Sequence, residues 1–279
     1  MKRAAEHLSR LAQELHIRAV YVDLDGTLLG PGGSLFAGAD GSVSFRAAQA
    51  VGALHQHEVA VVPLSGRTEP QVREAARLLG ATGFIAELGG ITSDGSETVR
   101  RYGRFRGPGT PYEAMARSGA AGVLLEAYPG RLEPHSPWAH LERECTMLFR
   151  GEVDPDEARH LLTRAGYDLV LHDNGITRRS FPDLTTSETH LYHLAPPGIG
   201  KAEAVAADVQ RRGLSATESA AVGDSPSDAA VAPHVGAMFI VANGAYAVER
   251  GSPAENVYVT DASHGDGFAE AMFGLLPGG

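Results

Sequence analysis

Apolar residues along the first third of the chain recur with two different periods. Short continuous apolar runs alternate with longer stretches in which apolar positions are three or four residues apart. The short runs are typical of buried strands and the longer stretches of amphipathic helices. The pattern predicts strands over residues 19–22, 59–64 and 83–87, with helices over 44–57 and 68–79. Leu8, Leu11 and Leu15 also recur at helical spacing, which predicts an N-terminal helix that packs on the body.

The last third of the chain repeats this alternation. It predicts strands over residues 219–222, 239–242 and 257–260, with helices over 200–212 and 267–275. Strands that alternate with helices are typical of an α/β fold with a parallel sheet. We therefore expect a doubly wound, Rossmann-like core built from residues 1–88 and 197–279.

The middle of the chain, residues 89–196, breaks this rhythm. It has Gly- and Pro-rich turns, strand-like runs at 123–125, 146–149 and 169–171, and a helical pattern over 155–164. Asn174-Gly175 is a hairpin turn signal. These features predict an inserted α+β domain. Its basic cluster is either a solvated face or a contact to a second anion on the substrate; the cluster comprises Arg100, Arg101, Arg104 and Arg106.

Charge and composition narrow the function. The 279 residues carry a formal net charge of −10, whereas nucleic-acid binders are usually basic, so we expect no nucleic-acid partner. No apolar run reaches the roughly 20 residues that span a bilayer, so we expect no membrane partner. The single cysteine, Cys145, cannot form an intrachain disulfide. We expect a cytoplasmic protein.

Two carboxylates stand two residues apart directly after the first predicted strand, at Asp23 and Asp25. A carboxylate at the end of a buried strand is desolvated unless a cation compensates it. Asp23 can attack phosphorus and form an aspartyl phosphate. Asp25 can protonate the leaving oxygen and then deprotonate water. Gly26 permits the sharp exit that places both groups; the alternative is a solvated turn.

Ser65-Gly66-Arg67 follows the second predicted strand, and Lys201 opens a predicted helix. A hydroxyl at a strand end can donate to a phosphoryl oxygen, and glycine lets the backbone approach it. A lysine at a helix N-terminus is disfavoured by the helix dipole unless an anion lies there too. Lys201 therefore indicates a bound phosphoryl group. The alternatives are a plain strand–helix junction and a solvated surface lysine.

Asp224 and Asp228 follow another predicted strand, one helical turn apart. Mg²⁺ prefers oxygen ligands, and Asp224 would be the second carboxylate beside Asp23. Asp228 can lie behind and orient a ligand or a bound water. A helix N-cap explains Asp224 without any metal. The C-terminal ends of strands in an open α/β sheet meet at the ligand crevice, so the four stretches are expected to share one site.

In this order, DLDGT, LSGR, the lysine of GIGK and GDSPSD resemble the motifs of the haloacid-dehalogenase (HAD) superfamily of phosphatases. The insert is similar to the family's type-II cap in position and length. The segments 241–244 and 265–267 are similar to the Cof-like, sugar-phosphatase branch, which includes proteins like mannosyl-3-phosphoglycerate phosphatase. The resemblance covers residues 19–87 and 197–273. Ser225 and Ser227 depart from it, because the branch has asparagine there, and we expect this to tune the site.

The resemblance implies a role for each motif residue. It makes Asp23 the nucleophile and Asp25 the general acid and base, with Ser65 and Lys201 holding the phosphate. It implies a Mg²⁺ site formed by Asp23, Asp25 through its backbone carbonyl, Asp224 and the supporting Asp228. It places five residues around the substrate: Gly26, Thr27, Gly66, Arg67 and Asn243.

We therefore expect a Mg²⁺-dependent phosphomonoester hydrolase, a monomer or small homo-oligomer, that works through an aspartyl phosphate. Its substrate would be a small phosphate ester such as a sugar phosphate or a glycosyl-phosphoglycerate. One alternative is a phosphosugar mutase of the same superfamily, which would move a phosphoryl group between two positions of one sugar. Another is a non-catalytic sugar-phosphate-binding protein, which would bind without turnover. Dehalogenation is less consistent with this chain, because that reaction needs neither Asp25 nor Asp224.

Overall fold

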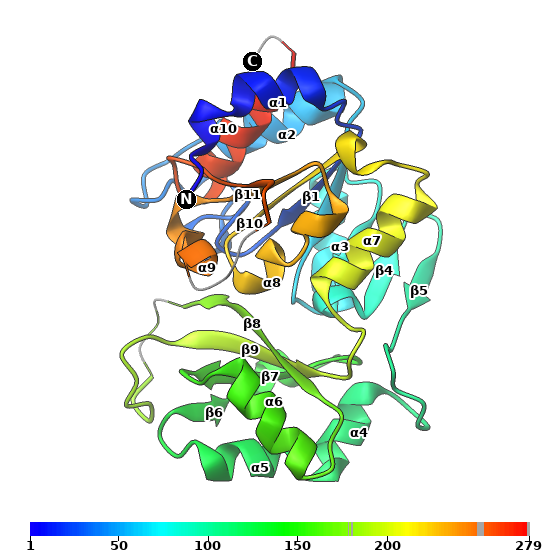
Figure 1. Ribbon diagram of the computed structural model, residues 1–279, viewed down its shortest axis with the longest axis vertical. Coiled ribbons are helices and arrows are strands. Elements are labelled where there is room, and N and C mark those ends of the chain that lie inside the picture. Colours follow the sequence, from blue (N-terminus) through cyan, green and yellow to red (C-terminus); the bar gives the residue numbers. More distant parts are fainter. Residues whose placement is uncertain (178, 180, 250–253, 278–279) are drawn as a thin grey trace.

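A computed structural model describes residues 1–177, 179, 181–249 and 254–277. The chain forms two bodies, each built on its own sheet (Figure 1). The larger body contains an eight-stranded sheet and both chain ends, and the smaller body contains a four-stranded sheet from the middle of the chain. The predicted α/β core with an α+β insert is confirmed as a fold class.

The large sheet has the strand order β12-β11-β10-β1-β2-β3-β4-β5. Its parallel strands are β1 (Ala19–Asp23), β2 (Ala60–Leu64), β3 (Phe84–Ala86), β10 (Ser219–Gly223), β11 (Ala237–Ile240) and β12 (Val257–Val259). The central strand β1 pairs with β2 on one side and β10 on the other. The crevice at such a topological switch point is where open α/β sheets bind ligands.

Helices cover both faces of the large sheet. On one face lie α1 (Leu8–Glu14), α2 (Arg46–Gln56) and α10 (His264–Leu275); on the other lie α7 (Lys201–Arg211), α8 (Pro226–Ala229) and α9 (Tyr246–Glu249). Within β1, Val20 and Val22 point to the first layer and Tyr21 to the second, as the two-residue period of a strand requires. The predicted N-terminal helix is confirmed, with Leu11 buried against α10.

Helix α3 (Glu69–Leu78) packs on β3, and Thr68 caps it together with Gln71 in a capping box. Short 3₁₀ helices join the larger elements: η1 (Ala4–Glu6), η2 (Pro31–Gly33), η3 (Glu87–Gly89), η4 (Pro137–His140), η5 (Ala216–Glu218), η6 (Ala232–His234) and η7 (Ala242–Gly244). Among the described helices, none combines the length and apolar character that crossing a bilayer requires.

The small sheet is antiparallel, with the order β6-β7-β9-β8. Its strands are β6 (Leu132–Pro134), β7 (Met147–Gly151), β8 (Val170–Ile176) and β9 (His190–Ala195). The helices α4 (Pro111–Ser118), α5 (Ala120–Ala127) and α6 (Pro155–Arg164) cover the face that points away from the large sheet (Figure 1). The opposite face of the small sheet therefore looks toward the crevice.

Three details of the middle segment differ from the sequence pattern. The predicted strand over residues 123–125 is wrong: this run lies in α5, where Ala120 and Leu124 are buried one helical turn apart. Asn174-Gly175 forms no hairpin turn but an irregularity inside β8, where the register shifts between Asp173 and Ile176. The hairpin of β4 (Ile91–Ser93) and β5 (Thr98–Arg100) extends the large sheet beyond β3, although the insert was predicted to begin at residue 89.

Candidate active site

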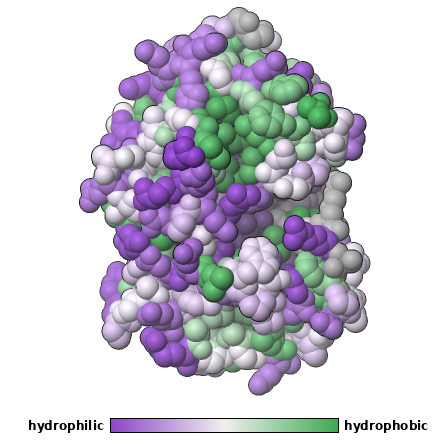
Figure 2. Space-filling view, turned by 180° about the vertical axis from the view of Figure 1, so that it is seen from behind, coloured by the Kyte–Doolittle hydropathy of each residue, from purple (hydrophilic) through white to green (hydrophobic). Residues whose placement is uncertain are grey.

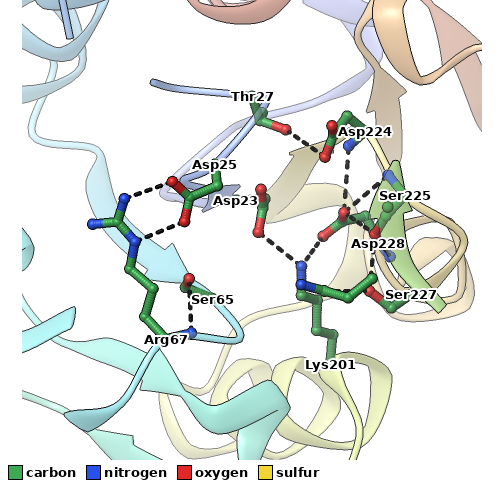
Figure 3. Close-up of polar contacts among 12 residues, drawn as sticks. Asp23, Asp25, Thr27, Ser65, Arg67, Lys201, Asp224, Ser225, Ser227 and Asp228 are labelled. Carbon is green, nitrogen blue, oxygen red and sulfur yellow. Dashed lines mark hydrogen bonds and ion pairs between the residues drawn. The ribbon is translucent and has the colours of Figure 1, made fainter. Parts of the chain in front are cut away.

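Three carboxylates meet at the C-terminal ends of β1 and β10 (Figure 3). Asp23 is the last residue of β1, Asp224 directly follows β10, and Asp228 lies in α8. One oxygen of each carboxylate lies within 4.8 Å of the other two. The two strands are parallel neighbours in register, so residues distant in sequence arrive at the same point of the sheet edge.

Lys201 lies at the centre of this cluster, and its side chain is 1% exposed. Its Nζ atom is 2.8 Å from Oδ1 of Asp23 and 2.7 Å from Oδ1 of Asp228. Burial alone would lower the pKa of Lys201, but the carboxylates of Asp228 and Asp23 outweigh burial and raise it. The lysine is therefore charged, and the two carboxylates offset the unfavourable helix dipole at the start of α7.

The cluster fits a divalent cation. Three carboxylates and one ammonium leave a formal charge of −2. Burial, and then the charges of Asp23 and Asp228, raise the pKa of Asp224 well above its ordinary value. Within the described part of the chain, no cationic side chain pairs with Asp224; it accepts long hydrogen bonds from Thr27 Oγ1 (3.3 Å) and Asn243 Nδ2 (3.4 Å). Mg²⁺ prefers a pocket of this kind, which is rich in oxygen ligands and carries excess negative charge.

Asp228 also organises the loop that follows β10. Its second oxygen, Oδ2, accepts hydrogen bonds from the backbone N–H groups of Asp224 (3.3 Å) and Ser225 (3.1 Å) and from the hydroxyl of Ser225. The Ser225 hydroxyl also caps α8 by accepting from the N–H of Asp228. The Ser225 hydroxyl thus satisfies the hydrogen bonds of this loop, and Asp228 supports the cluster from behind.

Asp25 stands apart from the acidic cluster. Its side chain is 56% exposed and forms a bidentate pair with Arg67, with distances of 2.6 Å from Nε to Oδ2 and 2.5 Å from Nη2 to Oδ1. The buried Ser65 hydroxyl accepts a hydrogen bond from the Arg67 backbone N–H at 3.2 Å. The predicted second motif therefore contacts the first one directly.

Gly26 makes possible the close approach of the turn after β1 to Asp224, which follows β10. Its φ is +87°, and a Cβ at this position would lie 2.2 Å from Oδ2 of Asp224. Only glycine avoids both the strained backbone and the clash. Asn243, predicted to bind substrate, donates to the Gly26 carbonyl at 2.9 Å and so braces this turn from behind.

The sequence reasoning missed His264. Its backbone N–H donates to Oδ1 of Asn243 at 2.8 Å, and its ring Nδ1 lies 2.9 Å from the Gly26 carbonyl. His264 has a positive φ of 53°, which few non-glycine residues adopt. No periodicity or motif in the sequence points to this contact.

The sequence reasoning also missed a junction between the two bodies. The carboxylate of Glu87 is fully buried and accepts backbone hydrogen bonds from residues 144, 145 and 146, at 2.9, 2.9 and 3.0 Å. The buried Arg143 donates to the Gly66 carbonyl at 3.0 Å. The loop before β7 is therefore attached to the segment that carries Ser65.

The basic cluster predicted in the middle segment lies away from the acidic site. Arg100 pairs with Glu69 and Glu144. Arg104 is 74% exposed, and Arg106 donates to carbonyls of its own loop. These contacts fit the interpretation of the cluster as a solvated face, whereas Arg143, which is not part of this cluster, contacts the loop after β2 through the Gly66 carbonyl.

No protein-family model matches the chain. Among curated proteins, it is 27% identical over 236 residues to a phosphoglycolate phosphatase of Methanoculleus marisnigri, which covers 84% of this chain and 90% of that one. Among solved structures, it resembles the sucrose-phosphatase of Synechocystis sp. PCC6803 (TM-score 0.63, 15% identity, 94% and 98% of the two chains). It also resembles a haloacid dehalogenase-like hydrolase of B. subtilis (TM-score 0.59, 17% identity, 93% and 100%). These structural likenesses show the fold.

Proposed function

We propose that this phosphatase, with its HAD-like fold, is a Mg²⁺-dependent phosphomonoester hydrolase that works through an aspartyl phosphate on Asp23. The observation that carries the proposal is the position of Lys201 between Asp23 and Asp228, beside Asp224. A buried ammonium that pairs with the nucleophile can also stabilise the negative charge of a phosphoryl group. The similarity to phosphatases supports the same reaction class.

Asp23 would attack phosphorus with the carboxylate oxygen that faces the crevice. Lys201 and the hydroxyl of Ser65 would hold the phosphoryl oxygens. Asp23, the backbone carbonyl of Asp25 and Asp224 would bind the metal, with Asp228 behind them. When bound, Mg²⁺ supplies charge neutralisation for the nucleophile and for the incoming phosphate.

Asp25 would serve as both acid and base. Paired with Arg67, it is a carboxylate, which is the form that can take a proton from the hydrolytic water. Protonation of the leaving oxygen in the first step requires the acid form, so this step requires the pair to open. Substrate entry next to Arg67 supplies an anion that can compete for the guanidinium.

The substrate would be a small phosphate ester. The curated relative is named for phosphoglycolate, and the solved neighbour for sucrose phosphate. A sugar phosphate, a glycosyl-phosphoglycerate and a phosphorylated two-carbon acid are therefore the classes to test. The cytoplasmic location, the monomeric or small homo-oligomeric state and the predicted domain limits of 1–88, 89–196 and 197–279 stay predictions.

The test is release of inorganic phosphate from phosphoglycolate, sugar phosphates, glycosyl-phosphoglycerates and p-nitrophenyl phosphate in the presence of Mg²⁺. We expect turnover that is absent from the Asp23→Asn variant. Transfer between two positions of one sugar, dependent on a bisphosphate primer, would instead identify the mutase alternative. Binding of these esters without turnover would identify a sugar-phosphate-binding protein.

A further inference from the structure

The small sheet turns a polar face toward the large body. Its other face packs on α4–α6 through apolar residues such as Phe149, Leu171 and Leu194. Because side chains alternate along a strand, the neighbouring positions point the other way. These are His172 and Asn174 on β8 and His193 on β9, with His172 directly opposite His193. In Figure 2, hydrophilic residues gather at the waist where the two bodies meet.

Two of these side chains meet above Gly66. A Cβ on Gly66 would lie 2.7 Å from both Cε1 and Nε2 of His193 and 3.0 Å from Nδ2 of Asn174. The imidazole and the amide therefore fill the space that a side chain at position 66 would need. This space adjoins Ser65, the residue proposed to hold the phosphoryl group, and consecutive Cα atoms are only about 3.8 Å apart.

The irregularity in β8 brings Asn174 to this point. Gly175 has a φ of +108°, and the strand register shifts there, so the strand bends toward α8. The Oδ1 atom of Asn174 accepts a hydrogen bond from the Ser227 hydroxyl at 3.0 Å. Asn174 is thus fixed between the loop after β10 and the loop after β2.

His193 is fixed from the opposite side. Its Nδ1 lies 3.1 Å from Oγ1 of Thr146, a hydroxyl that accepts from Arg143 at 2.9 Å and donates to Oε2 of Glu87 at 3.3 Å, so Nδ1 donates to this hydroxyl. In the described part of the chain, no hydrogen bond engages the other ring nitrogen, Nε2, which lies toward Gly66. Burial, and then the charges of Arg143 and other neighbours, lower the pKa of His193 well below its ordinary value, so the ring is neutral.

We infer that His193 and Asn174 bind an oxygen substituent on the leaving group of a short phosphate ester of two or three carbons: a hydroxyl would donate to Nε2 of His193, and a hydroxyl or carboxylate oxygen would accept from the amide of Asn174. The inference rests on the proposed function. The pair contacts Gly66, which directly follows Ser65, so the substituent that it can reach is one close to the phosphate along a short carbon chain.

The test compares three esters of similar size in the full chain with Mg²⁺. Phosphoglycolate carries a carboxylate, glycerol 3-phosphate carries hydroxyls, and ethyl phosphate carries neither. We expect the wild type to prefer at least one oxygenated ester over ethyl phosphate in kcat/KM. His193→Ala and Asn174→Ala should each reduce that preference by about tenfold, mainly through KM, because each removes a hydrogen bond to the substrate.

The matched control is His160→Ala, which removes an exposed histidine of α6 on the far side of the small sheet. If a variant loses the preference for phosphoglycolate alone, or for glycerol 3-phosphate alone, the inference is supported. The ester affected then shows whether the pair binds a carboxylate or a hydroxyl. An equal loss for all three esters, or none, in both variants would overturn it. Asn174→Ala removes no apolar core contact and so carries the test if His193→Ala does not fold.

Failure of this inference is distinct from failure of the proposed function. If the wild type hydrolyses p-nitrophenyl phosphate and larger sugar phosphates but none of the three short esters, the reaction class stands and the short-ester site is wrong. If it hydrolyses no phosphate ester at all with Mg²⁺, the proposed function itself is wrong.

Discussion

Arg67 holds Asp25 through two parallel hydrogen bonds, one from Nε and one from Nη2, to the two oxygens of the carboxylate. This geometry fixes the direction of the side chain as well as its charge. It places the proposed acid–base group at the rim of the acidic cluster, outside the set formed by Asp23, Asp224 and Asp228. The ion pair must open for proton donation and can re-form for proton removal from water.

Arg67→Lys should slow turnover because lysine keeps the charge but cannot form the planar double contact. We expect kcat to fall by about tenfold for alkyl phosphates, as part of the 10²–10⁴-fold that positioned proton transfer contributes. The effect should be similar for p-nitrophenyl phosphate, because the closed pair serves proton removal from water, a step that does not depend on the leaving group. Arg73→Lys, at an exposed pair with Glu69, is the control. Wild-type kinetics for Arg67→Lys on alkyl esters would contradict the role of this pair.

The two carboxylates of the first motif should differ when each is replaced. Asp23→Asn removes the nucleophile, so turnover should fall to background with every ester. Asp25→Asn removes only proton transfer, about 10²–10⁴-fold, and less with a good leaving group. Rapid mixing with p-nitrophenyl phosphate should show a burst followed by slow turnover in Asp25→Asn and no burst in Asp23→Asn. Near-normal turnover of any phosphate ester by Asp23→Asn would exclude it as the nucleophile.

Mg²⁺ should stabilise the protein as well as activate it. A ligand at a hundredfold excess over its Kd adds about 2.7 kcal/mol to the free energy of unfolding. For a chain of this size that corresponds to a rise in Tm of roughly 5–10 °C. Thermal unfolding with Mg²⁺ or with a chelator measures the shift, and phosphate release should stop in the chelator.

The Asp224→Asn variant tests whether the rise in Tm with Mg²⁺ comes from binding at the acidic cluster. The variant should lose the Mg²⁺-dependent rise in Tm, because one ligand of the acidic cluster is gone. Its metal-free form should unfold at a higher temperature than the metal-free wild type, because one of three mutually repelling carboxylates is removed. An unchanged Mg²⁺ shift in Asp224→Asn, or full activity of the wild type in excess chelator, would place the metal elsewhere or remove it from the reaction.

Glu87→Ala should weaken the junction between the two bodies. It leaves the buried Arg143 without its acidic neighbour at 3.7 Å and three backbone N–H groups without an acceptor. Removal of one partner from a buried pair typically costs about 3–5 kcal/mol. Glu74→Ala, at an exposed pair with Arg77, should cost no more than about 1 kcal/mol. Urea unfolding measures the free energy of unfolding of both variants. Equal decreases in Glu87→Ala and Glu74→Ala would show that Glu87 contributes no more to stability than an exposed ion pair.

Stability should fall in mild acid because of the histidines of the small body. Burial lowers the pKa of His135 to about 4, with Arg150, His140 and Arg143 adding to the effect, and burial also lowers the pKa of His172 and His193. In the unfolded chain a histidine binds its proton near pH 6.5, so between about pH 6.5 and 4 the unfolded state holds more protons. The contribution of these histidines to the free energy of unfolding should therefore decrease as pH falls through this window, whereas Asp23, whose pKa burial raises to about 7, contributes in the opposite direction.

Urea unfolding at pH 7.5, 6 and 5 measures this dependence. His135→Asn should flatten the slope of the free energy of unfolding between pH 6.5 and about 4, because one proton-linked group is removed. His160→Asn, on the exposed side of α6, serves as the control for histidine replacement. A slope that is the same in the wild type and in His135→Asn would show that this histidine does not govern acid sensitivity.

The α/β alternation and the three carboxylates of the acidic cluster can be predicted from the amino-acid pattern alone. Hydrophobic runs of strand length locate β1, β2 and β10 within a residue of their observed ends. Parallel strands place their C-terminal ends at one edge, so Asp23, Asp224 and the residues after β2 had to converge whatever the details of packing. The same rule cannot place Lys201, because this residue lies at the start of a helix and not at the end of a strand. A positive charge at a helix N-terminus is unfavourable unless an anion lies nearby, so its position indicated an anion.

Contacts between segments distant in sequence follow from how the elements pack, which no local pattern predicts. The run over residues 123–125 suits a strand or a helix, and packing of α5 on α6 selected the helix. Arg143 contacts Gly66 across 77 residues of sequence, and Glu87 contacts residue 144, in the loop before β7, across 57 residues. No local pattern predicts either contact. His193 and Asn174 meet above Gly66 only because a bulge bends β8. Periodicity reports which face of an element is buried, whereas the identity of its partner depends on how the two bodies pack together.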